Sequence, residues 1–246
     1  MIRACLAGLL LCALTAAAQD YEREKRWADE IVPGLVVGDA VWLPGPGGRT
    51  FLGLYTEAAN VRVAVLLVHG IGVHPDHGVI GVLRASLADA GFSTLSIQMP
   101  VLGSEALPSD YRPAAFAEAV GRIRAAGQWL RDKGAGQIVL VSHSLGSAMS
   151  GAYYEQAADS PFSAWVCMGL GGPFGSVRNV RGPILDVYGE KDLPGVLRAD
   201  WRRRMTVESR PGSQQAMIVG ADHYYAGRER QLVQVIEGFI RDQMQK

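Results

Sequence analysis

Residues 137–146 read QIVLVSHSLG. The apolar run before Ser142 is typical of a strand that is buried on both faces of a parallel sheet. Residues 145–158 fit a helix, so Ser144 falls at the turn between the two elements. A small residue, Ser142, lies two positions before it, and Gly146 lies two positions after it. This small-x-Ser-x-Gly pattern occurs easily by chance, but its place between a buried strand and a helix makes it informative.

The rest of the chain alternates strand-like and helix-like segments. Strands are expected at residues 50–55, 61–68, 92–98, 137–141, 164–168, 184–188 and 216–219, and helices at 79–91, 113–133, 145–158, 196–204 and 229–244. This alternation predicts an α/β fold with a mostly parallel central sheet and helices on both faces. Such sheets place their sites at the carboxyl ends of the strands. The short connection at 172–181 leaves no room for a large lid domain, so we expect an open mouth, walled by residues 101–112 and the loop near Phe174.

The N-terminus resembles a leader that is removed. Residues 1–18 contain Arg3, an apolar run and a group of alanines ahead of Gln19. This is the pattern of a secretory signal peptide, and the apolar run is shorter than the ~20 residues of a membrane-spanning helix. We therefore expect a single domain over residues 19–246, a periplasmic or secreted location, and no stable membrane insertion. A lipid-modified Cys12 is the alternative interpretation.

Charge and cysteine content exclude several classes of protein. The chain has 24 basic and 24 acidic residues, and loss of Arg3 with the leader leaves a net charge of −1. A nearly neutral chain gives no electrostatic reason to bind nucleic acid or an anionic membrane. Because Cys5 and Cys12 lie in the leader, Cys167 would be the one cysteine of the mature chain. No internal disulfide is expected, and the core must stabilise the fold.

Three polar residues come directly after predicted strands. They are Ser144, Asp192 in a Gly-x-x-Asp segment, and His223. Their placement and order resemble those of the α/β-hydrolases, whose nucleophilic serine stands on a sharp strand-to-helix elbow. The resemblance covers roughly residues 50–245 and leaves residues 19–44 unexplained. It implies a catalytic triad in which His223 is the general base for Ser144 and Asp192 holds the imidazole in one tautomer.

The same resemblance implies an oxyanion hole. A His-Gly turn, His69 and Gly70, follows the predicted strand 61–68. In these hydrolases the next backbone N–H, here that of Ile71, stabilises the oxyanion together with the N–H of Leu145. His69 itself is expected to be a buried turn residue and not a proton carrier. Tyr224 and Tyr225, beside the histidine of the triad, are expected in the pocket wall.

Other residues compete for these roles. Ser142 and Ser147 are rival nucleophiles, although neither has a glycine two positions later. Ser144 could instead be a helix N-cap. Asp186 is the rival acid; it lies in a strand that is predicted to be buried, so its charge needs a partner that the sequence does not identify. Glu190 is a weaker rival that we expect to be solvated.

Two further clusters have simpler interpretations. His74, Asp76 and His77 could in principle bind a metal, but a turn with Asp76 near a helix N-terminus is favoured. No metal or cofactor is expected. Arg198 and residues 202–204 form a basic cluster with acidic neighbours, which indicates a solvated helix face; a contact to an anionic substrate is the alternative.

The segments HGIGVHPD at 69–76 and TLSIQMP at 94–100 are also similar to a family of secreted bacterial α/β-hydrolases of undefined function. This resemblance supports an envelope location but supplies no substrate. The expected function is that of a secreted serine hydrolase that cleaves a small-molecule carboxylic ester or thioester through an acyl-serine intermediate. The alternatives are a non-catalytic envelope binding protein, which is favoured by Ser142 at a position where these hydrolases usually have glycine, and an amidase or peptidase. The sequence does not indicate an oligomeric state.

Overall fold

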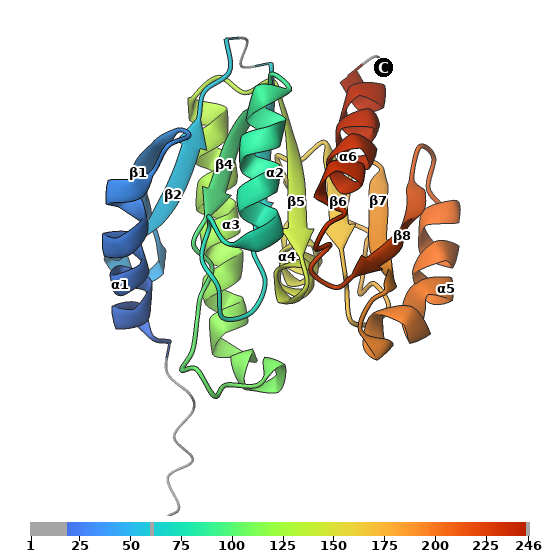
Figure 1. Ribbon diagram of the computed structural model, residues 1–246, viewed down its shortest axis with the longest axis horizontal. Coiled ribbons are helices and arrows are strands. Elements are labelled where there is room, and N and C mark those ends of the chain that lie inside the picture. The colour runs from blue at the N-terminus through green and yellow to red at the C-terminus, as the bar shows by residue number, and fades with distance from the viewer. Residues whose placement is uncertain (1–18, 60–61, 245–246) are drawn as a thin grey trace, which may run out of the picture.

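A computed structural model describes residues 19–59 and 62–244 of the chain (Figure 1). The predicted signal peptide lies outside the described residues and stays a prediction. The helices are α1 (Tyr21–Ile31), α2 (Gly78–Asp89), α3 (Ala114–Asp132), α4 (Leu145–Gln156), α5 (Pro194–Glu208) and α6 (Glu229–Met244). The strands are β1 (Asp39–Pro44), β2 (Thr50–Thr56), β3 (Val63–Val68), β4 (Ser93–Ile97), β5 (Gln137–His143), β6 (Ala164–Met168), β7 (Ile184–Lys191) and β8 (Gln214–Asp222).

The strands form one eight-stranded sheet in the order β1-β2-β4-β3-β5-β6-β7-β8. β2 pairs antiparallel with both β1 and β4, and every other neighbouring pair is parallel. Strand β3 is apolar throughout and all its residues are buried, because helices cover both faces of the sheet. The predicted mostly parallel sheet is confirmed.

Two apolar layers enclose the sheet, one on each face. The first contains Phe116 and Ile123 of α3 together with Met149 of α4. The second contains Leu83 of α2 and Ile236 of α6. In Figure 1, α2 and α6 accordingly lie in front of the sheet, and α3 and α4 lie behind it. The serine predicted at the end of β5 is thus held between two packed layers.

The prediction missed the first two elements of the described chain, α1 and β1. Helix α1 begins at an N-cap, Asp20, whose side chain accepts a hydrogen bond from the N–H of Arg23. Its buried residues are few, and its core contact is Ala28 against Leu52 and Leu54 of β2. Only four of its eleven residues are apolar, namely Tyr21, Trp27, Ala28 and Ile31. The helix therefore also depends on polar contacts with residues that are distant in the chain.

One such contact is a buried ion pair. Arg122 of α3 donates from Nη1 to Glu24 Oε2 at 2.9 Å and to the carbonyl oxygen of Gln98 at 2.9 Å. Its Nε donates to Glu118 Oε1 at 3.1 Å. Burial raises the pKa of Glu24, although Arg122 opposes the rise. The pair ties α1 to α3 and to the chain that leaves β4.

Candidate active site

The turn at Ser144 has the geometry that the sequence predicted. Ser144 has φ 57° and ψ −122°, a strained conformation for a residue with a side chain, and α4 begins at the next residue. Its backbone N–H donates to the carbonyl oxygen of Met168 at 2.8 Å. A Cβ atom at Gly146 would collide with the carbonyl oxygens of His69 and Val68. Glycine is therefore required at the position where the sequence pattern places it.

Ser142 replaces the glycine that is usual two positions before the elbow serine. Its side chain is fully buried. The hydroxyl accepts a hydrogen bond from Trp165 Nε1 at 2.9 Å and lies 3.4 Å from the carbonyl oxygen of Val166, to which it donates. Because these partners belong to β6, the hydroxyl joins β5 to β6 and takes no part in the contacts of Ser144.

The structure brings Ser144, His223 and Asp192 together in one hydrogen-bonded chain. Ser144 Oγ lies 2.8 Å from His223 Nε2, and His223 Nδ1 lies 2.6 Å from Asp192 Oδ1. Asp192 also accepts from the N–H groups of Gly189 at 3.0 Å and Leu193 at 2.7 Å. Burial alone would raise the pKa of Asp192, but these hydrogen bonds outweigh it and lower the pKa. The carboxylate is held ionised beside the imidazole.

A second histidine supports the first, and sequence analysis missed it. His143 Nε2 lies 2.9 Å from the carbonyl oxygen of His223, to which it donates, and the two rings are 4.9 Å apart. Burial lowers the pKa of His143 to about 4, so the ring is neutral at neutral pH. Tyr225, with φ 58°, anchors the same loop by donating its hydroxyl to the carbonyl oxygen of Val187 at 3.2 Å.

His69 is the buried turn residue that the sequence analysis expected. Burial lowers its pKa to about 3, which keeps the ring neutral. Nδ1 donates to the carbonyl oxygen of Gly70 at 2.8 Å, and Nε2 accepts from the N–H of Met99 at 2.8 Å. Gly70 packs against Ser144, since a Cβ there would lie 3.1 Å from the Cβ of that serine. His69 thus fixes the turn that carries Ile71.

The backbone N–H groups of Ile71 and Leu145 border the serine. Both residues line the cavity beside Ser144. Leu145 is the first residue of α4, where N–H groups point out of the helix and the helix dipole favours negative charge. Within residues 19–59 and 62–244 neither N–H has a hydrogen-bond acceptor. The loop after Ile71 is held by Arg23, which donates to the carbonyl oxygens of Gly72 at 3.4 Å and Leu102 at 2.9 Å.

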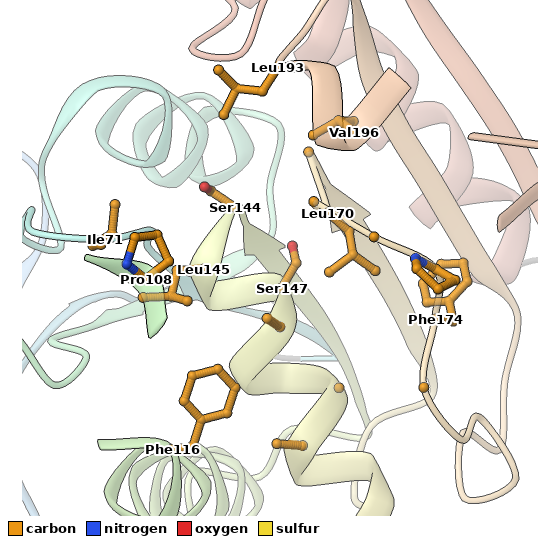
Figure 2. Close-up of a pocket in the computed structure, with 18 of the residues that line it drawn as sticks. Ile71, Pro108, Phe116, Ser144, Leu145, Ser147, Leu170, Phe174, Leu193 and Val196 are labelled. Carbon is orange, nitrogen blue, oxygen red and sulfur yellow. The ribbon is translucent and has the colours of Figure 1, made fainter. Parts of the chain in front are cut away.

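A cavity of about 680 Å³ opens beside Ser144. Figure 2 shows the serine above α4, with Ile71 and Pro108 on one side and Leu170 and Phe174 on the other. The predicted walls, residues 101–112 and the loop near Phe174, therefore do border it. Residues 169–183, between β6 and β7, contain no helix, so no lid stands over the site.

Comparisons with known proteins support this reading of the fold. A lidless α/β serine hydrolase from Xanthomonas campestris superposes with a TM-score of 0.64 at 17% identity, covering 84% of this chain and 95% of that one. Est1E from Butyrivibrio proteoclasticus with bound ferulic acid gives 0.66 at 13% identity, covering 84% and 100%. An esterase from Pyrococcus furiosus gives 0.61 at 12% identity, covering 84% and 97%. The chain has the α/β-hydrolase fold.

The sequence comparisons add less. Residues 13–122 match the model of a family described as a protein of unknown function, DUF3530. No curated protein matches the sequence significantly. The matched segment includes α1 and β1, the two elements of this α/β-hydrolase fold that the sequence analysis left unexplained.

Two predictions about side chains near the site are wrong. Neither Tyr224 nor Tyr225 lines the cavity, because the turn after β8 leaves Tyr224 67% exposed and buries Tyr225 in the core. Arg203 was assigned to a solvated basic face, yet it is fully buried. Its Nε lies 2.9 Å from both carboxylate oxygens of Asp186, which identifies the partner that this aspartate needs.

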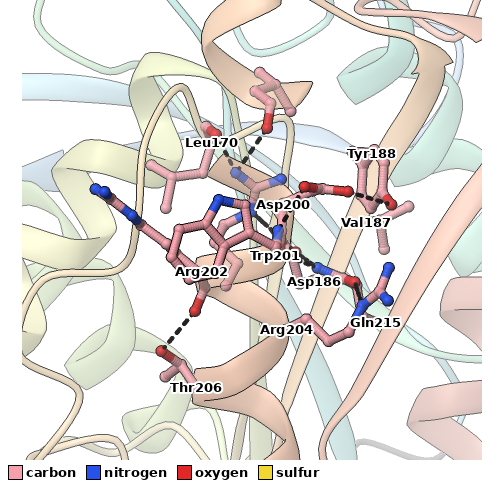
Figure 3. A network of polar contacts seen from close by, with 12 residues as sticks. Leu170, Asp186, Val187, Tyr188, Asp200, Trp201, Arg202, Arg204, Thr206 and Gln215 are labelled. Carbon is pink, nitrogen blue, oxygen red and sulfur yellow. Dashed lines mark hydrogen bonds and ion pairs between the residues drawn. The ribbon is translucent and has the colours of Figure 1, made fainter. Parts of the chain in front are cut away.

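The ion pair of Asp186 and Arg203 holds part of the cavity wall in place. Arg203 Nη1 donates to the carbonyl oxygens of Leu170 at 3.0 Å and Gly172 at 3.1 Å, both of which line the cavity. Gln215 Nε2 donates to Asp186 Oδ2 at 2.8 Å. Figure 3 shows Leu170 and Gln215 on opposite sides of this network. The carboxylate of Asp186 is bound by Arg203 and Gln215, whereas His223 is bound by Asp192, so Asp186 is not the acid of the Ser144 site.

The remaining rivals also have structural roles. Ser147 donates to the carbonyl oxygens of Ser142 at 2.9 Å and Met168 at 3.0 Å, so its hydroxyl is committed. Glu190 is exposed and accepts from the N–H of Gly220 at 2.8 Å. Asp76 pairs with Arg84 of α2 at 2.7 Å. Over the described ranges no group of three or more His, Cys, Asp or Glu side chains could hold a metal, and no helix there is long and apolar enough to cross a bilayer.

Proposed function

We propose that the protein is a serine hydrolase that cleaves carboxylic esters or thioesters through an acyl-serine intermediate. The observation that carries the proposal is the continuous chain Ser144 Oγ–His223 Nε2–His223 Nδ1–Asp192 Oδ1, with distances of 2.8 and 2.6 Å. These distances allow proton transfer from the serine to the imidazole. The esterases among the structural neighbours agree with this assignment, although their low identity argues for the fold alone.

The proposed reaction has two halves. His223 takes the proton of Ser144 as Oγ attacks the carbonyl carbon, and it returns that proton to the leaving alcohol or thiol. A water molecule, activated by the same imidazole, then releases the acid and restores the serine. Asp192, held ionised by three hydrogen bonds, stabilises the imidazolium that forms in each half.

The oxyanion of each tetrahedral intermediate would be stabilised by the N–H groups of Ile71 and Leu145. Both N–H groups border the serine without an acceptor of their own among the described residues. Removing one such donor from a serine hydrolase costs roughly 3 kcal/mol of barrier stabilisation. His143, as a neutral donor to the carbonyl oxygen of His223, positions the base without touching the substrate.

The test is labelling of the mature protein with a fluorophosphonate, in parallel with hydrolysis of p-nitrophenyl acetate. The parent should be labelled and should turn over, whereas Ser144→Ala and His223→Ala should do neither. Ser147→Ala is the matched control, since Ser147 is on the same helix but its hydroxyl is committed to carbonyl oxygens. A folded parent that neither labels nor hydrolyses the ester contradicts the proposal and favours a binding protein.

We also propose export to the periplasm or the medium. This rests on the leader pattern of residues 1–18 alone. Expression of the full chain with fractionation, followed by N-terminal sequencing of the exported form, would test it; a full-length cytoplasmic product would contradict it.

A further inference from the structure

We propose that the cavity beside Ser144 is an acyl-chain groove with α4 as its floor, and that it selects esters of medium-length fatty acids. The proposal rests on the hydrolase function above and adds the substrate class. The cavity has a volume of about 680 Å³, more than an acetyl group requires.

One face of α4 forms the floor of the groove. Leu145, Ala148, Ala152 and Glu155 all line the cavity, and their spacing of three or four residues places them on one side of a helix. From Leu145 to Glu155 the helix advances about 15 Å, at a rise of about 1.5 Å per residue. The small side chains between these two ends leave room for a chain laid along the helix. Gly151 adds to this room, since a Cβ there would meet only Trp165, at 4.0 Å.

The polar groups of Ser147 and Trp165, which line the groove, already have hydrogen-bond partners. The hydroxyl of Ser147 is committed to the carbonyl oxygens of Ser142 and Met168. The indole N–H of Trp165 is committed to the hydroxyl of Ser142. The walls are Phe116 on one side and Leu170 and Phe174 on the other (Figure 2). Burying one CH₂ group in a protein typically contributes about 0.8 kcal/mol. In this groove, each added methylene of the acyl chain should therefore raise the affinity about fourfold.

The far end of the groove is polar and open to water. Arg112 and Glu155 line it, and both are exposed. The guanidinium of Arg112 lies 3.9 Å from the ring centre of Phe116, at the point where the apolar wall ends. A chain that reaches this point gains nothing from further methylenes, because they enter solvent. The preference should therefore rise with chain length and then stop rising.

The proton path decides which half of the ester occupies the groove. The leaving oxygen must accept its proton from His223 Nε2, which lies 2.8 Å from Ser144 Oγ. The leaving group therefore stays on the side of His223, where Leu193 is half exposed at the mouth. The acyl group extends the other way, from Leu145 toward Ala152.

The test is the chain-length profile of p-nitrophenyl acetate, butyrate, octanoate and palmitate. For the parent we expect kcat/KM to rise about fourfold per methylene from acetate through butyrate to octanoate, and to rise by clearly less per methylene from octanoate to palmitate, whose chain extends past the apolar walls. Ala152→Phe should lower the ratio of octanoate to acetate at least tenfold. Ala148→Phe, one turn closer to Ser144, should also lower the ratio of butyrate to acetate. Gln156→Phe, exposed on the same helix and outside the cavity, is the matched control and should leave the profile of the parent.

A binding measurement separates the groove from the chemistry. Octanoate should raise the melting temperature of the Ser144→Ala protein, and adding Ala152→Phe should abolish the shift. The groove is overturned, while the hydrolase stands, if the parent hydrolyses the acetate ester without preferring the octanoate ester. The same conclusion follows if Ala152→Phe lowers kcat/KM equally for all four esters. If no ester is cleaved but octanoate still stabilises Ser144→Ala, the groove stands and the hydrolase fails. Absence of any shift with octanoate overturns the groove.

Discussion

Replacing Arg203 by methionine removes a cation from a site where both partners of an ion pair are fully buried. The guanidinium Nε contacts both oxygens of Asp186, and Nη1 donates to the carbonyl oxygens of Leu170, Gly172 and Val196. Breaking a buried pair on one side typically costs 3–5 kcal/mol, since a charge is left without compensation. We expect Arg203→Met to lower the free energy of unfolding by about 4 kcal/mol at neutral pH.

The cost should depend on pH in a defined direction. Burial already raises the pKa of Asp186 beside Arg203. Without the guanidinium the pKa rises further, so the folded variant binds a proton that the unfolded chain does not. A raised carboxyl pKa adds stability as the pH falls through it. Arg203→Met should therefore be less destabilised, relative to the parent, at pH 5 than at pH 8.

Urea denaturation followed by circular dichroism measures both effects. Arg202→Met is the matched control, because Arg202 is the neighbouring residue of α5 and is exposed, so its loss should stay within about 0.5 kcal/mol. The double variant Asp186→Leu/Arg203→Met should recover part of the loss, since it leaves no buried charge. It should not recover all of it, because the three carbonyl oxygens stay without a donor. An Arg203→Met loss below about 1 kcal/mol would refute the reasoning.

Three further perturbations test other contacts in the structure. Asp192→Asn should lower kcat for p-nitrophenyl acetate roughly 10³- to 10⁴-fold, with fluorophosphonate labelling slowed in parallel and KM little changed, because the imidazole loses its stabilising anion; a loss under tenfold would contradict the role. Burial lowers the pKa of His69 from 6.5 to about 3 and that of His143 from 6.5 to about 4. As the pH falls below 6.5, the unfolded chain therefore binds protons that the folded protein does not, and the folded protein loses stability. Urea titrations should show about 2 kcal/mol lost per histidine by pH 5, and His143→Gln should flatten this slope. Glu24→Leu should cost about 2 kcal/mol, as Arg122 loses a charged partner but keeps others; an unchanged urea midpoint would contradict the anchoring of α1.

The parts of the site that the sequence predicted are those with a local pattern. Ser144, Asp192 and His223 each come directly after a strand, and strand order in a parallel sheet brings such positions to one edge. Gly146 is part of a local pattern because no other residue fits there: the carbonyl oxygens of Val68 and His69, at the end of β3, leave no space for a Cβ. The central strands were predicted within a few residues, since apolar runs buried on two faces are unambiguous. The sequence predicted that the three side chains lie at the same edge of the sheet. It did not predict the distances between them.

The parts that the sequence did not predict depend on partners far away in the chain. Arg203 lies in a helix rich in basic residues, and nothing local separates it from Arg202 beside it. Only the folded structure places Asp186 against Arg203 and leaves Arg202 exposed to water. Tyr224 and Tyr225 pose the same difficulty. In the structure Tyr225 has a positive φ and is buried, whereas Tyr224 is exposed. The sequence of two adjacent tyrosines does not indicate which of them is buried.

The missed contacts explain why α1 belongs to the site even though it carries none of its reactive groups. Arg23 joins Gly72, next to the turn of Ile71, to Leu102 in the loop that follows β4. Glu24, one residue later, pairs with Arg122, which in turn holds the carbonyl oxygen of Gln98; the side chain of Gln98 lies 3.2 Å from His69 Nε2. Both routes from α1 end on the turn that presents the N–H of Ile71. An oxyanion hole acts through donors that are fixed before the reaction. Under the proposed function, a helix that holds this turn would therefore act on the reaction barrier as well as on the stability of the fold.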